Sequence, residues 1–361
     1  MKIDKKFRVG ILGATGMVGQ RFITILADHP WFEICVLAAS SRSKGLKYSE
    51  AVEGRWKLEI PMPEKVKDML VYDVADIDYI SKEVDFVFSA VDMTKEEIKA
   101  IEEAYAKAEV PVVSNNSAHR MTKDVPMVIP EINPEHFEII EKQKERLGTT
   151  KGFIAVKPNC SIQGYMPCLK AWEEFEPTKM VVTTYQAISG AGKNFETWPE
   201  MVGNVIPYIG GEELKSEVEP LKILGKIDGN EILLKDDLKI SAQCVRIPVL
   251  NGHTAAAFIS FKKNPTKEEL IDRLKNYKGI PQEGNLPSAP KTFVQYFEQE
   301  DRPQVSLDVD YEGGMGVSIG RLREDTVFDY KFIGLAHNTL RGAAGGAVLC
   351  AETLVYLGYI K

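Results

Sequence analysis

The chain has 361 residues, of which 44% are hydrophobic and 27% charged, and its formal net charge is −7. This composition is typical of a globular protein of roughly two domains, and the negative net charge gives no basic footprint for nucleic acid. No apolar stretch reaches the ~20 residues that span a bilayer, and the charged residues before Phe7 do not resemble a signal peptide, so we expect a cytoplasmic protein that binds neither membranes nor nucleic acid.

Cysteine and histidine residues give no sign of a metal site. The five cysteines are odd in number and scattered, and no C-x-x-C pair occurs. Neither a disulfide framework nor a zinc site fits this spacing. The sequence therefore predicts a protein without a bound metal.

Apolar runs alternate with helical patterns over the first half of the chain. Thr94 and Glu97 have the spacing of a capping box, which predicts the start of a helix there. Alternating strands and helices favour an α/β domain with a parallel sheet of the Rossmann type. The predicted strands cover residues 7–12, 33–40, 84–90 and 110–115.

A glycine-rich segment, GATGMVG, lies between the first predicted strand and the helical pattern that follows it. Dinucleotide-binding folds place glycines there because they allow a tight turn, close approach to the pyrophosphate and close packing of the helix. N–H groups at the start of the helix then face the phosphates. A glycine-rich turn without a ligand is the competing interpretation. The residues predicted to contact the cofactor are Gly13, Thr15, Gly16, Met17, Val18 and Gly19.

The end of the second predicted strand indicates which dinucleotide is bound. NAD-binding folds usually place an acidic residue there, but this chain has Ser40, Ser41, Arg42 and Ser43. Hydroxyl groups and a guanidinium suit a 2′-phosphate, which a carboxylate would repel. We therefore predict NADP as the cofactor.

The pattern changes after about residue 157. Longer strands are predicted, and their polar connections favour a mixed sheet covered by helices on one face. The small and apolar residues near the C-terminus favour a final helix that packs back on the first domain. We predict a dinucleotide-binding domain of residues 1–157 and 338–361, and an α+β catalytic and dimerisation domain of residues 158–337.

Cys160 precedes a segment, SIQGYMPCLKAWEEF, in which apolar residues recur at roughly helical spacing. A cysteine at the start of a helix has its thiolate favoured by free N–H groups and by the helix dipole. Pro167 does not fit a continuous helix, because an interior proline kinks or ends it. A lone cysteine is more often a buried structural residue, so the neighbouring motifs must decide between the two interpretations.

Six ordered motifs carry a resemblance to a known family. They are the glycine-rich segment, SNNSAHR, PNCS, QAISGAG, RIPVLNGHT and HNTLRGAAG. In this order they resemble aspartate-β-semialdehyde dehydrogenase, most closely the branch found in archaea and fungi. The resemblance runs essentially from end to end.

The resemblance implies reversible reductive dephosphorylation of L-4-aspartyl phosphate to L-aspartate 4-semialdehyde, in lysine, threonine and methionine biosynthesis. Cys160 would attack the acyl carbon, phosphate would leave, and the thioester would accept hydride from the nicotinamide. His253 is similar to the family's acid-base histidine, and Gln186 to the glutamine that orients the substrate. A homodimer or homotetramer is also implied.

The substrate needs a cation for its carboxylate, an anion for its ammonium and cations for its phosphate. Arg246 fits the first through a bidentate fork, and we place it on the same strand as His253 with a turn between them. Glu219 and Lys222 resemble the family's Glu-x-x-Lys pair for ammonium and phosphate, although a surface ion pair is the competing interpretation. The resemblance also assigns substrate contacts to Arg120 and Asn159, and cofactor contacts to Ser189, Gly190 and Asn338.

Other functions remain open. Malonyl-CoA reductase and N-acetylglutamyl-phosphate reductase use the same thioester chemistry and would share Cys160. Glu219 together with Arg246 favours a substrate that carries both an ammonium and a carboxylate. A non-catalytic NADP-binding redox sensor would not need the reactive residues. We assign no chemistry to residues 301–304, DRPQ, which also match a family string.

Overall fold

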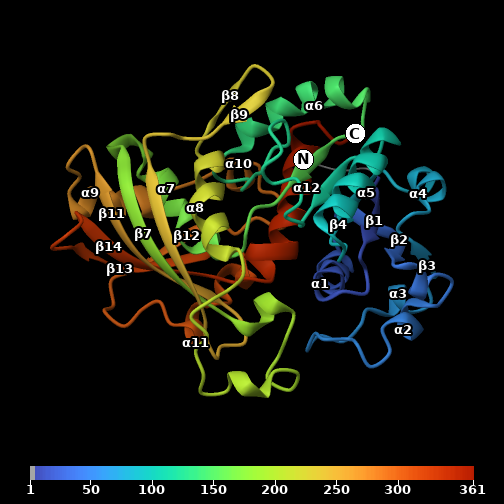
Figure 1. Ribbon diagram of the computed structural model, residues 1–361, viewed down its shortest axis with the longest axis horizontal. Helices are drawn as coiled ribbons and strands as arrows, with labels where there is room; N and C mark the ends of the chain where they lie inside the picture. The colour runs from blue at the N-terminus through green and yellow to red at the C-terminus, as the bar shows by residue number, and fades with distance from the viewer. Residues whose placement is uncertain (1–4) are drawn as a thin grey trace.

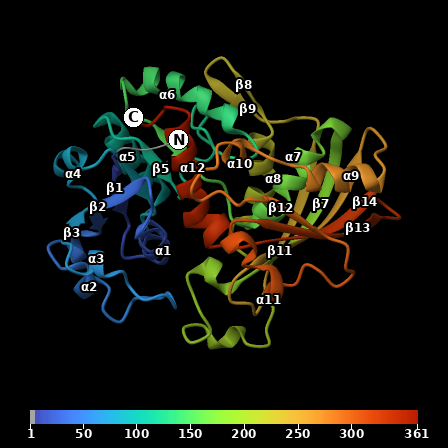
Figure 2. The same ribbon diagram turned by 180° about the vertical axis from the view of Figure 1, so that it is seen from behind.

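The structure is a computed structural model and describes residues 5–361. It contains two six-stranded sheets, and helix α12 (Gly345–Tyr356) lies between them in both views (Figures 1 and 2). Within residues 5–361, no helix is both long and apolar enough to cross a bilayer. The same residues contain no group of three or more His, Cys, Asp or Glu side chains placed to hold a metal ion.

The first sheet is entirely parallel and has the strand order β3-β2-β1-β4-β5-β6, which is that of the Rossmann fold. In such sheets ligands bind beyond the carboxyl ends of the strands, where the order reverses between β1 and β4. The predicted parallel sheet is therefore confirmed. Its strands are β1 (Phe7–Leu12), β2 (Phe32–Ala39), β3 (Val71–Asp73), β4 (Phe86–Ser89), β5 (Val112–Ser114) and β6 (Ile154–Val156).

Successive residues of each strand point to opposite faces of this sheet, and both faces are buried. Val9 and Ile11 belong to a core shared with α1 (Met17–Leu26) and α12, whereas Val36 and Ala38 belong to a second core. That second core includes residues of α4 (Ile77–Glu83) and α5 (Lys95–Lys107). The return of α12 to the first sheet follows the apolar, small-residue composition of the C-terminal segment. The remaining helices of this part are α2 (Tyr48–Ala51), α3 (Glu64–Lys67) and α6 (Ile140–Leu147).

Helix α5 begins as its sequence predicts. The N–H of Glu97 donates to the hydroxyl of Thr94 (3.3 Å), and the N–H of Thr94 donates to the Glu97 carboxylate (2.9 Å). This reciprocal pair satisfies two N–H groups that the helix leaves without internal partners. The predicted capping box is confirmed.

The second sheet is mixed, with the order β10-β7-β11-β14-β13-β12. Pairs β7–β10 and β12–β13 are parallel, and the other neighbours are antiparallel. Helices α7 (Met166–Ala171), α8 (Glu212–Ile223) and α9 (Lys267–Lys275) pack against it (Figure 1). The strands are β7 (Pro177–Gln186), β10 (Lys239–Arg246), β11 (His253–Phe261), β12 (Val294–Phe297), β13 (Val317–Glu324) and β14 (Tyr330–Ala336). Smaller elements are β8 (Lys226–Asp228), β9 (Glu231–Leu233), α10 (Ile280–Glu283) and α11 (Val305–Asp308).

The segment after Cys160 differs from the continuous helix suggested by its periodicity. It divides into a 3₁₀ turn over Ser161–Gly164, helix α7, and a second 3₁₀ turn over Glu173–Phe175. Pro167 lies in the first turn of α7, where its missing N–H removes no helical hydrogen bond. The proline therefore starts a short helix and does not kink a long one.

Candidate active site

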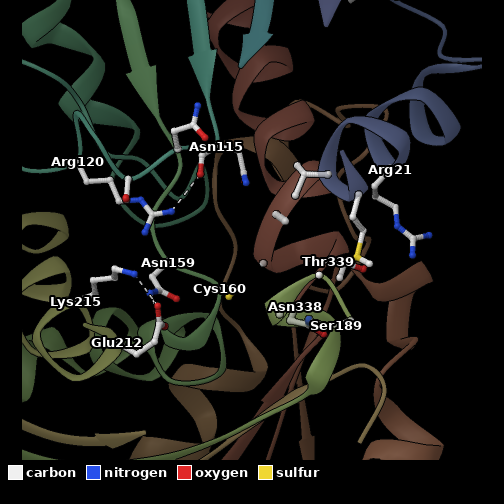
Figure 3. A pocket seen from close by; sticks show the side chains of 18 residues that line it. Arg21, Asn115, Arg120, Asn159, Cys160, Ser189, Glu212, Lys215, Asn338 and Thr339 are labelled. Atoms are coloured by element: carbon white, nitrogen blue, oxygen red, sulfur yellow. Dashed lines mark hydrogen bonds and ion pairs between the residues drawn. The ribbon is translucent and has the colours of Figure 1, made fainter. Parts of the chain in front are cut away.

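Cys160 lies in the loop that leaves the carboxyl end of β6, at the junction of the two sheets. Its side chain is half-buried and borders a cavity of about 300 Å³ (Figure 3). Gly342 allows the C-terminal segment to approach, because a Cβ there would lie 2.7 Å from the Cβ of Cys160. The cavity is lined by Met17, Val18, Arg21, Asn115, Asn116, Ser117, Arg120, Asn159, Cys160, Ser189, Gly190, Gly192, Glu212, Lys215, Asn338, Thr339, Gly342 and Ala343.

Three neighbouring strands of the second sheet bring the other predicted reactive side chains to this junction. Gln186 ends β7 and is in register with Arg246, which ends the parallel strand β10. His253 begins β11 on the other side of β7, next to the pairing of Thr254 with Tyr185. The prediction that Arg246 and His253 share one strand is therefore wrong. The segment between them crosses the end of β7, and Gly252 supplies the positive φ (+96°) that this path requires.

His253 faces the sulfur of Cys160. Its Nε2 lies 3.5 Å from Sγ, and its Nδ1 accepts the N–H of Ala187 at 3.0 Å. Because a backbone N–H can only donate, Nδ1 is the unprotonated nitrogen of a neutral ring, and Nε2 carries the proton. Burial, assisted by the charge of Arg246, lowers the pKa of His253 to about 3, so the ring is neutral at pH 7.

The environment of Cys160 contradicts the expected activation by a helix start. The residues that follow it form a single 3₁₀ turn, which is too short to supply a substantial dipole. Burial and the nearby Glu212 carboxylate raise the pKa of the thiol, whereas the charges of Lys157, Arg120 and Arg246 act in the opposite direction. Ionisation of Cys160 therefore depends on neighbouring cations.

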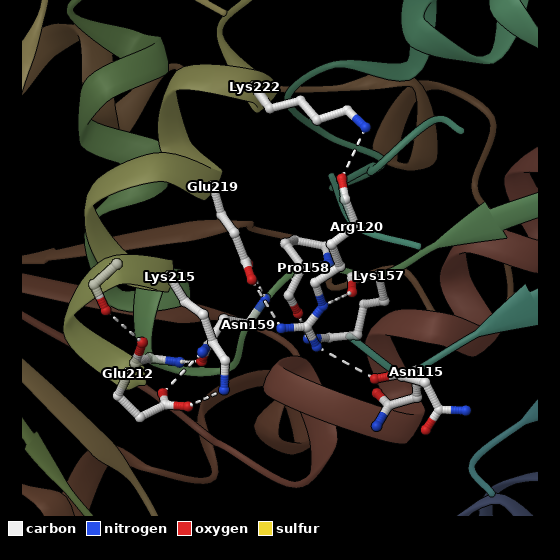
Figure 4. Close-up of polar contacts among 12 residues, drawn as sticks. Asn115, Arg120, Lys157, Pro158, Asn159, Glu212, Lys215, Glu219 and Lys222 are labelled. Atoms are coloured by element: carbon white, nitrogen blue, oxygen red, sulfur yellow. Dashed lines mark hydrogen bonds and ion pairs between the residues drawn. The ribbon is translucent and has the colours of Figure 1, made fainter. Parts of the chain in front are cut away.

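Glu219 and Lys222 are both turned toward Arg120 (Figure 4), and neither lines the cavity. Both side chains are buried. Glu219 forms an ion pair with Arg120 (2.9 Å) and accepts the N–H of Asn159 (2.6 Å). The ammonium of Lys222 donates to three carbonyl oxygens, those of Arg120 (2.7 Å), Thr122 (2.7 Å) and Val125 (2.8 Å). These contacts hold helix α8 to the first domain.

A second Glu-x-x-Lys pair, seven residues earlier in α8, does line the cavity, and the sequence reasoning missed it. Glu212 and Lys215 form an ion pair (2.7 Å), and Glu212 also accepts the side-chain N–H of Asn159 (2.8 Å). Burial opposes ionisation of Glu212, but the charge of Lys215 and these hydrogen bonds outweigh it and keep the pKa of this carboxyl below its usual value. The available signal was the repetition of the spacing, which occurs twice on one helix.

Arg120 joins the two domains beside Cys160. Its Nη1 pairs with Glu219, its Nε donates to the carbonyl of Lys157 (3.0 Å), and Nη2 donates to the carbonyl of Asn115 (3.3 Å). The guanidinium still borders the cavity, on the same side as Lys215 (Figure 3). Arg120 and Lys215 therefore offer two positive charges to an anion in this cavity.

Most of the predicted cofactor residues line either this cavity or a second one, whereas Gly19, Ser41 and Ser43 line neither. The turn is compatible only with glycines at two places: a Cβ at Gly13 (φ +86°) would lie 2.3 Å from the carbonyl oxygen of Ala90, and one at Gly19 would lie 2.2 Å from that of Gly13. Gly13 thus follows β1 against the residue after β4, at the reversal of strand order. The second cavity, of about 250 Å³, is lined on this side by Gly13, Thr15, Gly16, Ser40 and Arg42.

The other predicted cofactor residues lie around the start of α1, after β2 and near Asn338. Met17 and Val18, at the start of α1, line the larger cavity. Ser41 and Ser43 occupy the 3₁₀ turn of Arg42 without lining the smaller one. At the far end, the side chain of Asn338 donates to the hydroxyl of Ser189 (2.8 Å), and Gly190 lies against Arg246 and His253.

Local hydrogen bonds account for the conformation of residues 301–304. Arg302 Nε and the N–H of Gln304 both donate to the carboxylate of Asp308, at 2.7 and 2.6 Å. The segment closes the loop before α11 and does not line either cavity described above.

Comparisons with known proteins identify the family. Residues 8–140 match the family described as semialdehyde dehydrogenase, NAD binding domain, and residues 169–341 match semialdehyde dehydrogenase, dimerisation domain. The chain is 42% identical over 352 residues to the aspartate-semialdehyde dehydrogenase of Archaeoglobus fulgidus, covering 97% of this chain and 98% of that protein. It is 42% identical over 362 residues to that of Saccharomyces cerevisiae, covering 96% and 97%.

Two solved structures give the same result. The aspartate semialdehyde dehydrogenase of Candida albicans with NADP has a TM-score of 0.88 at 39% identity, covering 99% of this chain and 100% of that one. The aspartate semialdehyde dehydrogenase II of Vibrio cholerae complexed with ASA has a TM-score of 0.74 at 26% identity, covering 98% and 99%. The chain therefore belongs to the aspartate-semialdehyde dehydrogenase family.

Proposed function

We propose that this chain is an NADP-dependent aspartate-semialdehyde dehydrogenase that reductively dephosphorylates L-4-aspartyl phosphate to L-aspartate 4-semialdehyde, reversibly and through a thioester on Cys160. The observation that carries the proposal is the 3.5 Å approach of His253 Nε2 to the Cys160 sulfur, beside a cavity lined by one carboxylate and several cations. The relatives named for this enzyme support the same assignment.

The charges around the cavity fit the three charged groups of the substrate. Arg246 does not itself line the cavity; its Nη1 donates to the carbonyl of Ala187 (2.7 Å), and its guanidinium lies against Gly190, which does. We keep Arg246 as the cation for the carboxylate because a guanidinium can bind it bidentately. Glu212 is ionised and suits an ammonium. Arg120 and Lys215 suit a phosphate. We assign the ammonium to Glu212, and not to Glu219, because Glu212 lines the cavity and Glu219 does not.

The chemistry at Cys160 requires a thiolate, a stabilised oxyanion and a leaving phosphate. The N–H of Ser161 donates to the Asn159 side chain (2.8 Å), so it is not free to bind an oxyanion, and we assign that role to the N–H of Cys160. The phosphate would leave toward Arg120 and Lys215. Attack by sulfur on the acyl carbon forms the thioester as the carbon–phosphate oxygen bond breaks.

His253 acts on this centre through Nε2. In the neutral ring this nitrogen donates a hydrogen bond to sulfur or to the oxyanion that develops beside it. A full acid-base cycle requires Nδ1 to take a proton, and the N–H of Ala187 opposes that. Gln186 adjoins the same centre at the end of β7 and contacts the hydroxyl of Thr184 (3.2 Å).

The residues around the glycine-rich turn fit a dinucleotide. The turn between β1 and α1 would hold the pyrophosphate, and Ser40 with Arg42, just after β2, would hold the 2′-phosphate. Arg55 and Asp92 line the same cavity. Ser189, Gly190 and Asn338 would border the nicotinamide end. The reduced cofactor, NADPH, would supply the hydride that reduces the thioester, and NADP would accept it in the reverse reaction. The Candida albicans relative was solved with NADP.

The finer biological assignments rest on the family. We propose roles in lysine, threonine and methionine biosynthesis, and a homodimer or homotetramer. From Met180 onwards, β7 alternates between buried and solvent-facing residues, and two of the solvent-facing ones are apolar or aromatic: Val181 and Tyr185, 38% and 37% exposed. That face of the second sheet suits contact with a second copy.

Steady-state assays with L-aspartate 4-semialdehyde and phosphate test the proposal, once with NADP and once with NAD. We expect NADP to be preferred and Cys160→Ser to lose most activity while NADP binding is kept. Faster turnover of malonyl-CoA than of the semialdehyde, or full activity in Cys160→Ser, would overturn the assignment.

A further inference from the structure

Lys157 is a buried cation that the proposed mechanism leaves unexplained. Lys157 is 2% exposed, and its ammonium has one hydrogen-bond acceptor, the carbonyl of Pro158. Within residues 5–361, no carboxylate lies within ion-pair distance of it. An ammonium carries three N–H groups, and burying it without a partner costs several kcal/mol. Burial and the charge of Arg120 lower the pKa of Lys157 to about 7.

A second buried lysine shows what a purely structural lysine looks like in this fold. Lys222 is also 2% exposed, and burial lowers its pKa to about 7 as well. Its three N–H groups, however, each meet a backbone carbonyl within 2.8 Å. The contacts of Lys222 account for its position, whereas those of Lys157 do not.

The position of Lys157 relates it to Cys160. Both side chains pack against the same stretch of the C-terminal segment, where glycines make room for them. A Cβ at Gly342 would lie 2.7 Å from the Cβ of Cys160, and a Cβ at Gly346 would lie 3.1 Å from the Cε of Lys157. The two glycines do not belong to one regular helix, because Ala343 between them has non-helical φ and ψ angles (−142° and −111°). Cys160 lines the cavity and Lys157 does not, so Lys157 lies on the protein side of Cys160.

We propose that Lys157 is a positioning residue for Cys160, whose thiolate its buried ammonium stabilises from the protein side. The inference rests on the proposed function, in which Cys160 must react as a thiolate. The neutral tautomer of His253 already has a proton on Nε2, so His253 cannot readily accept the proton of the thiol. If the proton moves from the sulfur of Cys160 to Nζ of Lys157, the resulting thiolate and ammonium compensate each other's charge. The pair as a whole then neither gains nor loses a proton.

Other charged groups modify this balance. Facing the sulfur, Arg120 and Arg246 favour the thiolate and Glu212 opposes it. Facing Lys157, Arg120 and Arg341 repel the ammonium, whereas Glu219 attracts it. Among these cations, Arg120 is paired with Glu219 (2.9 Å). Within residues 5–361, Lys157 and Arg246 have no ion-pair partner, and each donates to a single carbonyl oxygen, that of Pro158 and that of Ala187 (2.7 Å). Lys157 is the more deeply buried of the two, 2% against 6% exposed, and the negative charges that favour its ammonium are those of Cys160 and Glu219.

The test measures ionisation of Cys160 directly. In the full chain without substrate, iodoacetamide labelling of Cys160 is followed by mass spectrometry from pH 5 to pH 10. We expect Lys157→Met to raise the midpoint of labelling by about one pH unit and to slow labelling at pH 7 about tenfold. Lys157→Arg, which keeps the charge, should restore most of the rate. Lys222→Met is the matched control: it should lower thermal stability without moving the midpoint.

A second measurement needs no variant. The wild-type chain labelled with ¹³C-lysine is titrated by NMR before and after alkylation of Cys160, and alkylation should lower the midpoint for Lys157. A folded Lys157→Met protein with an unchanged labelling midpoint would overturn the inference, as would an NMR midpoint that alkylation leaves in place. Either result would leave the proposed function intact if Cys160→Ser is inactive, so the two failures can be distinguished.

Discussion

Helix α8 carries the same Glu-x-x-Lys spacing twice, in two regions with different environments. In the first turn, Glu212 and Lys215 border the cavity, and the Lys215 side chain is 32% exposed. Two turns later, Glu219 and Lys222 are each 2% exposed and contact only the protein. Positions seven residues apart on an α-helix are two turns apart and differ in direction around the axis by only about 20°. Both pairs therefore lie on one face of α8.

The difference between the pairs arises from where the helix runs. Its first turn begins at the edge of the active-site cavity, and its later turns enter the contact between the two domains. An identical spacing therefore supplies groups that can bind a ligand at one end and groups that hold the fold at the other. The two pairs should respond differently to the same substitutions.

The largest effect is expected from Glu219→Gln. Removing one charge of a buried ion pair leaves the Arg120 guanidinium without its partner, and such losses cost about 3–5 kcal/mol. We expect the free energy of unfolding to fall by this amount, measured by urea denaturation at fixed protein concentration. Glu212→Gln is the matched control and should lose much less stability. Equal losses in both variants would show that the two regions do not differ in this way.

A smaller effect, on activity and not on stability, is expected from Glu212→Gln. A hydrogen bond to a charged group contributes about 1.5–3 kcal/mol, so kcat/KM for aspartate semialdehyde should fall about 10- to 100-fold. The dissociation constant of NADP should stay unchanged. Succinate semialdehyde, which lacks the ammonium, provides the control substrate.

With that control substrate, wild type and Glu212→Gln should have similar kcat/KM values. A comparable loss with both substrates would mean that Glu212 does not recognise the ammonium. The first-turn pair would then act by shaping the cavity, and Glu219 would again have to be considered for this role.

Much of the fold could be predicted from the sequence because its signals are local. The glycine-rich turn lies between a strand and a helix, and Gly13 and Gly19 prove to be positions where a side chain would collide with the backbone. The capping box of Thr94 and the apolar C-terminal helix are likewise set by neighbouring residues. These features depend on a few consecutive positions.

The arrangement of the site could not be predicted in the same way, because it depends on long-range pairing. Arg246 and His253 lie on separate strands only because β7, some 60 residues earlier in the chain, pairs between them. Which Glu-x-x-Lys pair borders the cavity depends on how α8 meets the first domain. The burial of Lys157 and the hydrogen bond that sets the His253 tautomer have no sequence signal that we can identify.

The smallest effect is expected from Lys215→Met, which removes the cation of the first-turn pair. Lys215 is partly exposed, so solvent and salt screen its charge, and we expect the KM for phosphate to rise about tenfold or less with little change in kcat. The rise should shrink as ionic strength increases, whereas the stability loss of Glu219→Gln should depend far less on salt because that pair is buried. Measuring KM for phosphate at low and high salt checks both statements. An unchanged KM would leave Arg120 as the phosphate-binding cation and restrict the role of Lys215 to keeping Glu212 ionised.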